Sequence, residues 1–220
     1  MNVGKKKKKY LWLLGLIIVL ICFFVLLPKN KEKSMIDKTL KEENPKAALI
    51  IAFQGFQDKE YDDTKEVLEE NNITVETVSS EKGEAEGKFG EKIKIEKTLE
   101  EIKVDDYRAI VFIGGPGALD YVKNTVAHRI ARETLDKGKI LAAICVAPEI
   151  LAEAQVLEGK KATVWSQSFD QEEVKFLEDR GAIFSNEDLV IDGKIVTANG
   201  PMAAKKFGQK IAELLLGENQ

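Results

Sequence analysis

Residues 139–154 read KILAAICVAPEILAEA, and this stretch decides the fold. Lys139 to Ile144 is almost wholly apolar and has the length of a strand that is buried on both faces. Pro148 then opens a helix-forming segment, in whose first turn proline is well tolerated. Cys145 stands between the two, at a sharp bend. The stretch therefore predicts a strand-to-helix unit of a parallel sheet, with a cysteine at the carboxyl end of the strand.

The segments on both sides repeat this alternation of short apolar runs and amphipathic helices. Strands alternating in this way with helices predict an α/β fold with a doubly wound, mostly parallel sheet flanked by helices. We expect residues 81–90, which are charged and rich in glycine, to form a loop or a hairpin. Further strands are expected at 47–53, 73–78, 109–113, 162–165, 182–184, 189–191 and 195–198, and helices at 58–70, 128–135 and 202–216.

Cys145 is the first candidate for chemistry. At a strand-to-helix bend, a thiol meets unpaired N–H groups and the positive end of a helix, and both favour the thiolate. Residues 114–117, GGPG, end another predicted strand and could supply backbone N–H groups as an oxyanion hole. The plainer alternatives are a buried structural cysteine and a tight turn that needs small residues.

The first 45 residues differ in composition from the rest. They carry 10 lysines against 4 acidic residues, whereas residues 46–220 carry 23 basic against 33 acidic residues. Residues 1–9 form a basic tail, and the 18 residues from 10 to 27 carry no charge, which is about the length that spans a bilayer. We interpret 10–28 as a transmembrane signal-anchor and 29–45 as a charged tether; the alternative, a cleaved signal peptide, lacks a small-residue cleavage site. The five contiguous lysines favour an N-terminus on the cytoplasmic side of the cell membrane, with the body on the extracytoplasmic side.

Composition also excludes several classes of function. The acidic body argues against nucleic-acid binding, because neutralising phosphates requires a basic face. The chain has one histidine and two cysteines, which rules out a multi-His metal site within one subunit and a disulfide framework. We therefore expect no metal and no cofactor.

Residues 46–217 resemble the DJ-1/PfpI family, within the class I glutamine-amidotransferase-like fold. The resemblance implies a flavodoxin-like domain, a reactive cysteine at position 145, and assembly into homodimers or larger homo-oligomers. It also implies a Glu in the first strand-end motif whose carboxyl hydrogen-bonds the cysteine sulfur; we place Gln57 at that position. The motifs that carry the resemblance are GFQD at 55–58, GKFG at 87–90, FIGGPG at 112–117, AAICVAP at 142–148 and DGKIVTANGP at 192–201.

The family's other site residues transfer only in part. The protease-like branch has His directly after the cysteine, where this chain has Val146, and a Glu near Leu119, which Asp120 adjoins. The DJ-1-like branch has a His where this chain reads WSQS at 165–168. His128, the one histidine, is expected on a helix away from the site. The predicted site therefore consists of Cys145 and Gln57, with backbone support from Gly114, Gly115 and Val146.

The motifs and the family resemblance are compatible with three functions. The first is a membrane-anchored DJ-1/PfpI-like protein whose Cys145 meets oxidants or reactive carbonyls in a stress response. The second is a cysteine-dependent hydrolase, protease-like or glyoxalase-like, which the missing proton carriers count against. The third is a non-catalytic binding or scaffold module.

Overall fold

In a computed structural model, residues 44–166 and 171–217 are described. Their centre is a seven-stranded sheet in the order β11-β12-β8-β7-β1-β3-β6, in which every neighbouring pair is parallel except β11 with β12. The sheet strands are β1 (Lys46–Ile50), β3 (Thr74–Ser79), β6 (Lys97–Thr98), β7 (Ala109–Phe112), β8 (Ile140–Ile144), β11 (Leu189–Asp192) and β12 (Ile195–Ala198). The predicted mostly parallel α/β fold is therefore confirmed.

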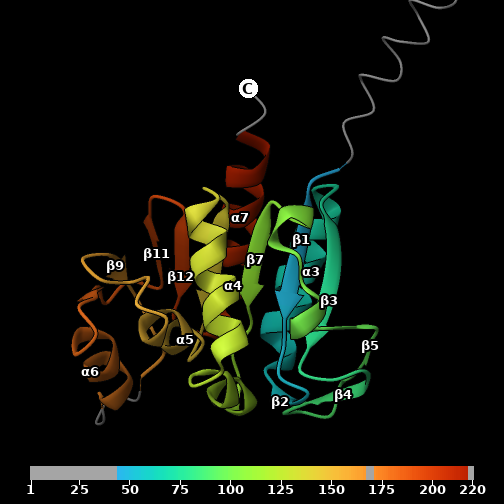
Figure 1. The fold of residues 1–220 in the computed structure, drawn as a ribbon, viewed down its shortest axis with the longest axis horizontal. Helices are drawn as coiled ribbons and strands as arrows, with labels where there is room; N and C mark the ends of the chain where they lie inside the picture. Colours follow the sequence, from blue (N-terminus) through green and yellow to red (C-terminus); the bar gives the residue numbers. More distant parts are fainter. Residues whose placement is uncertain (1–43, 167–170, 218–220) are drawn as a thin grey trace, which may run out of the picture. The chain divides into compact units, whose positions relative to one another are not determined.

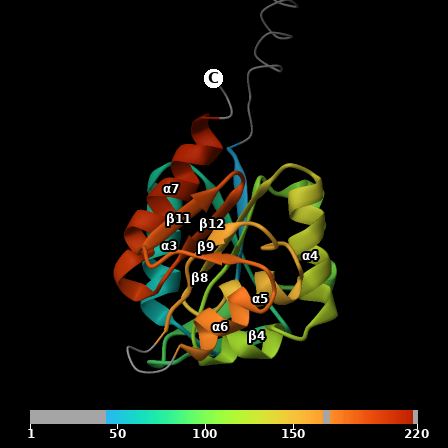
Figure 2. The same ribbon diagram turned by 90° about the vertical axis from the view of Figure 1, so that its left-hand side faces the viewer.

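Helices cover both faces of this sheet. One face packs against α3 (Asp58–Glu70) and α7 (Ala204–Gly217), and the other against α4 (Thr125–Asp136) and α5 (Pro148–Glu153), with α6 (Glu172–Glu178) packed on α5. Figure 2 shows α3 and α7 on one side of the strands and α4 on the other. The 3₁₀ segments are η1 (Leu99–Glu101), η2 (Val104–Asp106), η3 (Pro116–Tyr121) and η4 (Pro201–Ala203).

The central strands are buried because each of their faces meets a helical layer. In β1, Ala47 and Leu49 belong to the core under α3 and α7, whereas Ala48 and Ile50 belong to the core under α4 and α5. All four are fully buried. Successive side chains of a strand point to opposite faces, so a strand covered on both sides reads as a continuous apolar run.

Two small sheets lie outside the main one. The segment 81–90, expected as a loop or hairpin, contains β4 (Gly83–Gly87), which pairs with β5 (Lys92–Ile95) just beyond it. Both join β2 (Gln54–Phe56) in a three-stranded sheet at the carboxyl end of β1 (Figure 1). The strand expected at 162–165 is only β9 (Lys161–Ala162), which pairs with β10 (Ile183–Phe184). The strand ends at Ala162 because the next backbone N–H groups bond elsewhere: Thr163 N donates to Thr197 Oγ1, and Trp165 N donates to Cys145 O.

The predicted basic tail (1–9), membrane anchor (10–28) and most of the tether (29–45) lie outside the described residues. Within the described ranges, no helix is long and apolar enough to cross a membrane.

Candidate active site

Cys145 occupies the turn between β8 and α5. Its φ is +65°, a left-handed conformation that a non-glycine residue rarely adopts without a reason. Two backbone hydrogen bonds hold it there: Cys145 N donates to Ala198 O at 2.8 Å, and Trp165 N donates to Cys145 O at 2.9 Å. The residue is 9% exposed. The elbow predicted from the sequence is therefore present, and its thiol is nearly enclosed.

A carboxyl group lies beside this thiol, and it belongs to Glu60. Glu60 is fully buried in the first turn of α3, accepts a hydrogen bond from Gly114 N at 3.1 Å, and forms a side-chain hydrogen bond with Cys145. A Cβ on Gly114 would lie 2.5 Å from Cys145 Cβ and 2.7 Å from Glu60 Oε2, so the two side chains meet at this glycine. Among the described residues, Glu60 Oε1 has no hydrogen-bond partner.

Gln57, which the sequence analysis placed beside the sulfur, does something else. It is the N-cap of α3, and its Oε1 accepts a hydrogen bond from Lys59 N at 3.1 Å. The offset of three residues arises because Gln57 precedes the helix, whereas Glu60 is inside its first turn. Glu60 shares the buried face of α3 with Thr64 and Val67, at helical spacings of four and seven. A charged residue within an apolar stripe was the signal that could have identified it.

The three backbone groups expected to support the site divide between the two side chains. The N–H groups of Gly115 and Val146 donate to the Cys145 sulfur. Gly114 N donates to Glu60 instead. Gly115 has a φ of +105°, and a Cβ there would lie 2.5 Å from Gln57 N, so this approach of two loops requires glycine.

Burial governs the protonation of the pair. It raises the pKa of Glu60 from 4.5 to about 7, against the hydrogen bonds from Cys145 and Gly114 and the charge of Lys88, which lower it. Burial, followed by the charge of Glu60, also raises the pKa of the Cys145 thiol, although the Gly115 and Val146 N–H groups act in the opposite direction. The resting thiolate expected at the elbow is therefore disfavoured, because desolvation outweighs the N–H donors. Moving the thiol proton to Glu60 leaves the net charge of the pair unchanged.

The remaining candidates lie apart from the sulfur. His128, on α4, has its Nε2 2.7 Å from Val122 O, and α4 covers the opposite face of the sheet from Glu60. Leu119 is an exposed side chain in η3. Trp165 and Ser166 line a hollow of about 350 Å³ beside the elbow, and the last two residues of the 165–168 motif are not described. Among the described residues, no group of three or more His, Cys, Asp or Glu could hold a metal ion.

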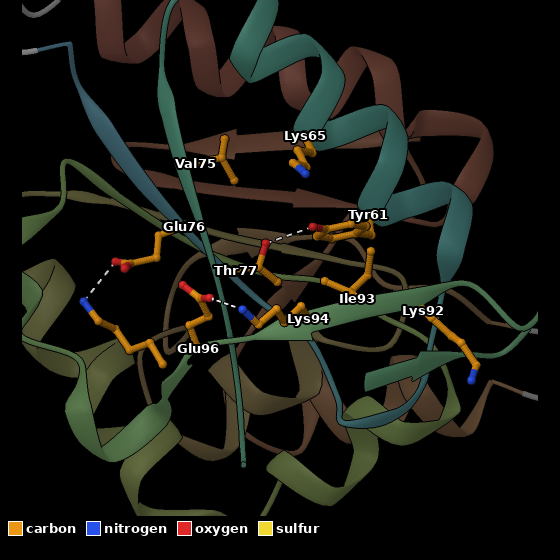
Figure 3. A pocket seen from close by; sticks show the side chains of 10 residues that line it. Tyr61, Lys65, Val75, Glu76, Thr77, Lys92, Ile93, Lys94 and Glu96 are labelled. Atoms are coloured by element: carbon orange, nitrogen blue, oxygen red, sulfur yellow. Dashed lines mark hydrogen bonds and ion pairs between the residues drawn. The ribbon is translucent and has the colours of Figure 1, made fainter. Parts of the chain in front are cut away.

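A larger hollow, of about 440 Å³, lies away from the thiol between α3, β3 and β5 (Figure 3). Lysines around it are paired with acids, such as Lys94 with Glu96, and Tyr61 hydrogen-bonds Thr77 across it. Because these polar side chains are paired with one another, the hollow offers few groups to a ligand. The Cys145–Glu60 pair therefore remains the candidate site.

Comparison with known proteins identifies the family of this chain. The sequence profile of the DJ-1/PfpI family matches residues 46–214. The chain belongs to the DJ-1/PfpI family. An uncharacterised protein of Methanocaldococcus jannaschii is 37% identical to this DJ-1/PfpI chain over 185 residues, covering 84% of the chain and 89% of the relative. The deglycase PfpI of Pyrococcus furiosus is 31% identical, covering 76% of the chain and 98% of the relative.

Solved structures show the same DJ-1/PfpI architecture. The crystal structure of a ThiJ/PfpI domain protein from Brachyspira murdochii superposes with a TM-score of 0.75 at 29% identity, covering 79% of this chain and 98% of that one. The family and fold expected from the sequence motifs are thus confirmed.

Proposed function

We propose that Cys145 and Glu60 form a nucleophile and proton carrier that act on small reactive carbonyl compounds. The observation that carries this proposal is the buried Glu60 carboxyl hydrogen-bonded to the Cys145 thiol. As the sulfur attacks a carbonyl carbon, the C–S bond forms and the thiol proton passes to the Glu60 carboxylate. The C=O electron pair moves to oxygen, which then takes that proton from Glu60 to give a hemithioacetal.

The surrounding backbone supports this addition. The Gly115 and Val146 N–H groups stabilise the sulfur when it carries negative charge, and Gly114 N–H orients the carboxyl. The name of the P. furiosus relative, a deglycase, also points to carbonyl chemistry. Hydrolysis by a Cys-His pair finds less support, because Val146 follows the cysteine and His128 bonds Val122 on the far face.

Methylglyoxal consumption by the full-length protein tests the proposal. We expect Cys145→Ala and Glu60→Ala to abolish it, and Gln57→Asn, which keeps a side chain able to cap α3, to retain most of it. Consumption that survives in Cys145→Ala would refute the assignment. A cellular phenotype that survives in the same variant would favour the scaffold alternative instead.

We further propose that residues 10–28 anchor the protein in the cell membrane, with the body on the extracytoplasmic side, and that the body forms homodimers or larger homo-oligomers. The basic tail before an uncharged 18-residue run supports the anchor, and the family resemblance supports the oligomer. Protease added outside intact cells should cleave the body, and light scattering on residues 46–220 should give a mass above that of one chain. An untouched body, or a monomeric mass, would contradict the respective part.

A further inference from the structure

We propose that Lys88 makes the Cys145 site select electrophiles that carry a negative charge, so that carbonyl compounds bearing a carboxylate react faster than neutral ones of similar size. This inference rests on the proposed function, because it concerns the same thiol. It starts from the loop between β4 and β5, which holds a lysine at the carboxyl end of the sheet.

The backbone of this loop is fixed by hydrogen bonds to the start of α3. Lys88 N donates to Phe56 O at 2.7 Å. The buried Asp58 carboxylate accepts hydrogen bonds from Phe89 N and Glu91 N, each at 3.0 Å. A Cβ on Gly87 would lie 2.4 Å from Asp58 Oδ1, so the loop is in close contact with this carboxylate. The backbone position of Lys88 is therefore fixed.

Backbone hydrogen bonds connect this loop to the strand end beside the sulfur. Phe56, which accepts the Lys88 hydrogen bond, is followed by Gln57, whose N donates to Gly114 O at 2.9 Å. The next glycine, Gly115, donates its N–H to the Cys145 sulfur. The charge of Lys88 also acts on Glu60, whose pKa it lowers. The loop that carries the Lys88 ammonium is thus joined by backbone hydrogen bonds to the segments that hold the Cys145–Glu60 pair.

The Lys88 ammonium is also available to a ligand. The side chain is exposed, and Nζ lies 5.4 Å from the centroid of the Phe89 ring. Among the described carboxylates none pairs with it, whereas Lys92 on the same hairpin is paired with Glu84 at 2.7 Å. The Asp58 carboxylate, which contacts this loop, is engaged by backbone N–H groups.

A matched pair of alkylating reagents tests this selectivity. Iodoacetate is anionic and iodoacetamide neutral, and both react by the same step: the thiolate forms a C–S bond as iodide leaves, and the thiol proton goes to Glu60 or to solvent. The measurement is the ratio of the two alkylation rates at Cys145, by mass spectrometry of the full-length protein at low ionic strength. Lys88→Gln and Lys88→Glu are compared with Lys88→Arg, and Lys92→Gln is the control.

We expect Lys88→Gln to lower the iodoacetate-to-iodoacetamide ratio about 3- to 10-fold, as the removal of one screened charge near the thiol would do. Lys88→Glu should lower it further, and Lys88→Arg and Lys92→Gln should leave it within about 2-fold of the wild type, because they keep the charge or lie outside the site. High salt should reduce the wild-type ratio. An unchanged ratio in both Lys88→Gln and Lys88→Glu would overturn the proposal, even if Cys145 itself proved reactive. Failure of iodoacetamide to alkylate Cys145 in every variant would instead refute the reactive thiol, and the selectivity with it.

Discussion

Replacing Glu60 with Gln should stabilise the protein above neutral pH and at the same time slow its chemistry. The carboxyl has a pKa of about 7 in the fold against an ordinary value of 4.5, because it is fully buried. Since the folded pKa is the higher one, this group's contribution to stability is complete below pH 4.5 and is lost as the pH rises through 7. A shift of this size corresponds to about 3 kcal/mol at pH 8.

Glutamine has the same shape and avoids this cost. Its Oε1 can still accept the hydrogen bond from Gly114 N, and its amide can donate to the sulfur, but it never ionises. We therefore expect urea denaturation of Glu60→Gln at pH 8 to give a free energy of unfolding about 2–3 kcal/mol above the wild type, and a difference near zero at pH 4.5. The rate of methylglyoxal consumption should fall by about 100-fold or more, because the thiol proton has no carboxylate to receive it.

Glu149 provides the matched control for this experiment. Burial and the charge of Glu173 raise the pKa of Glu149 to about 7, with Arg180 acting against the shift, and neither Cys145 nor Glu60 is among the groups that shift it. Glu149→Gln should therefore flatten part of the pH dependence of stability and leave the reactivity of Cys145 unchanged. If Glu60→Gln is less stable than the wild type at pH 8, or reacts as fast as the wild type, the proton-sharing pair is refuted.

Three further predictions concern the surroundings of the thiol. Dilute peroxide should add oxygen to Cys145 and not to Cys22 in the folded protein, because Glu60 can take the thiol proton as the sulfur attacks the peroxide; mass spectrometry of peptides measures this, and equal oxidation of Cys145 in folded and urea-unfolded protein would exclude an activated thiol. Gly114→Ala should lower the free energy of unfolding by about 2–4 kcal/mol and abolish methylglyoxal consumption, because its Cβ would fall 2.5 Å from Cys145 Cβ; wild-type stability would show that the contact can relax. Asp58→Ala should increase the amide hydrogen-exchange rate of Phe89 by about 10-fold or more, because the Asp58 carboxylate accepts a hydrogen bond from Phe89 N–H. An unchanged rate would show that this bond does not hold the loop.

The sequence was sufficient to predict the sheet because burial on both faces leaves a local signature. Residues 109–113 and 140–144 are continuous apolar runs, and they form the neighbouring strands β7 and β8. The same reasoning located Cys145, since a strand that passes directly into a helix leaves one residue at the bend. These features depend on neighbours in the chain, so a pattern of residue types can show them.

The sequence did not locate the partner of the thiol in the same way, because the partner depends on the residue at which α3 begins and on the direction in which each side chain then points. Gln57 and Glu60 are three residues apart, and only the start of α3 at Asp58 decides that one caps the helix while the other faces the sheet. Short strands were equally difficult: β9 has two residues and owes its end to hydrogen bonds with Cys145 and Thr197, which are distant in sequence. Contacts of this kind follow from the assembled fold and have no local pattern.

The position of Glu60 also favours one chemistry over others at this thiol. A buried cysteine with a raised pKa is a poor resting nucleophile, so it needs a base that takes its proton at the moment of attack. When the thiol is alkylated, the proton that Glu60 has received is not needed by the product. In addition to a carbonyl, the new oxygen anion needs a proton, and the carboxyl that received one lies beside the sulfur and can return it. Because Glu60 has a pKa of about 7, its carboxyl is present in both protonation states at neutral pH and can accept the proton in one transfer and return it in the other, and this supports reversible carbonyl addition as the reaction of the pair.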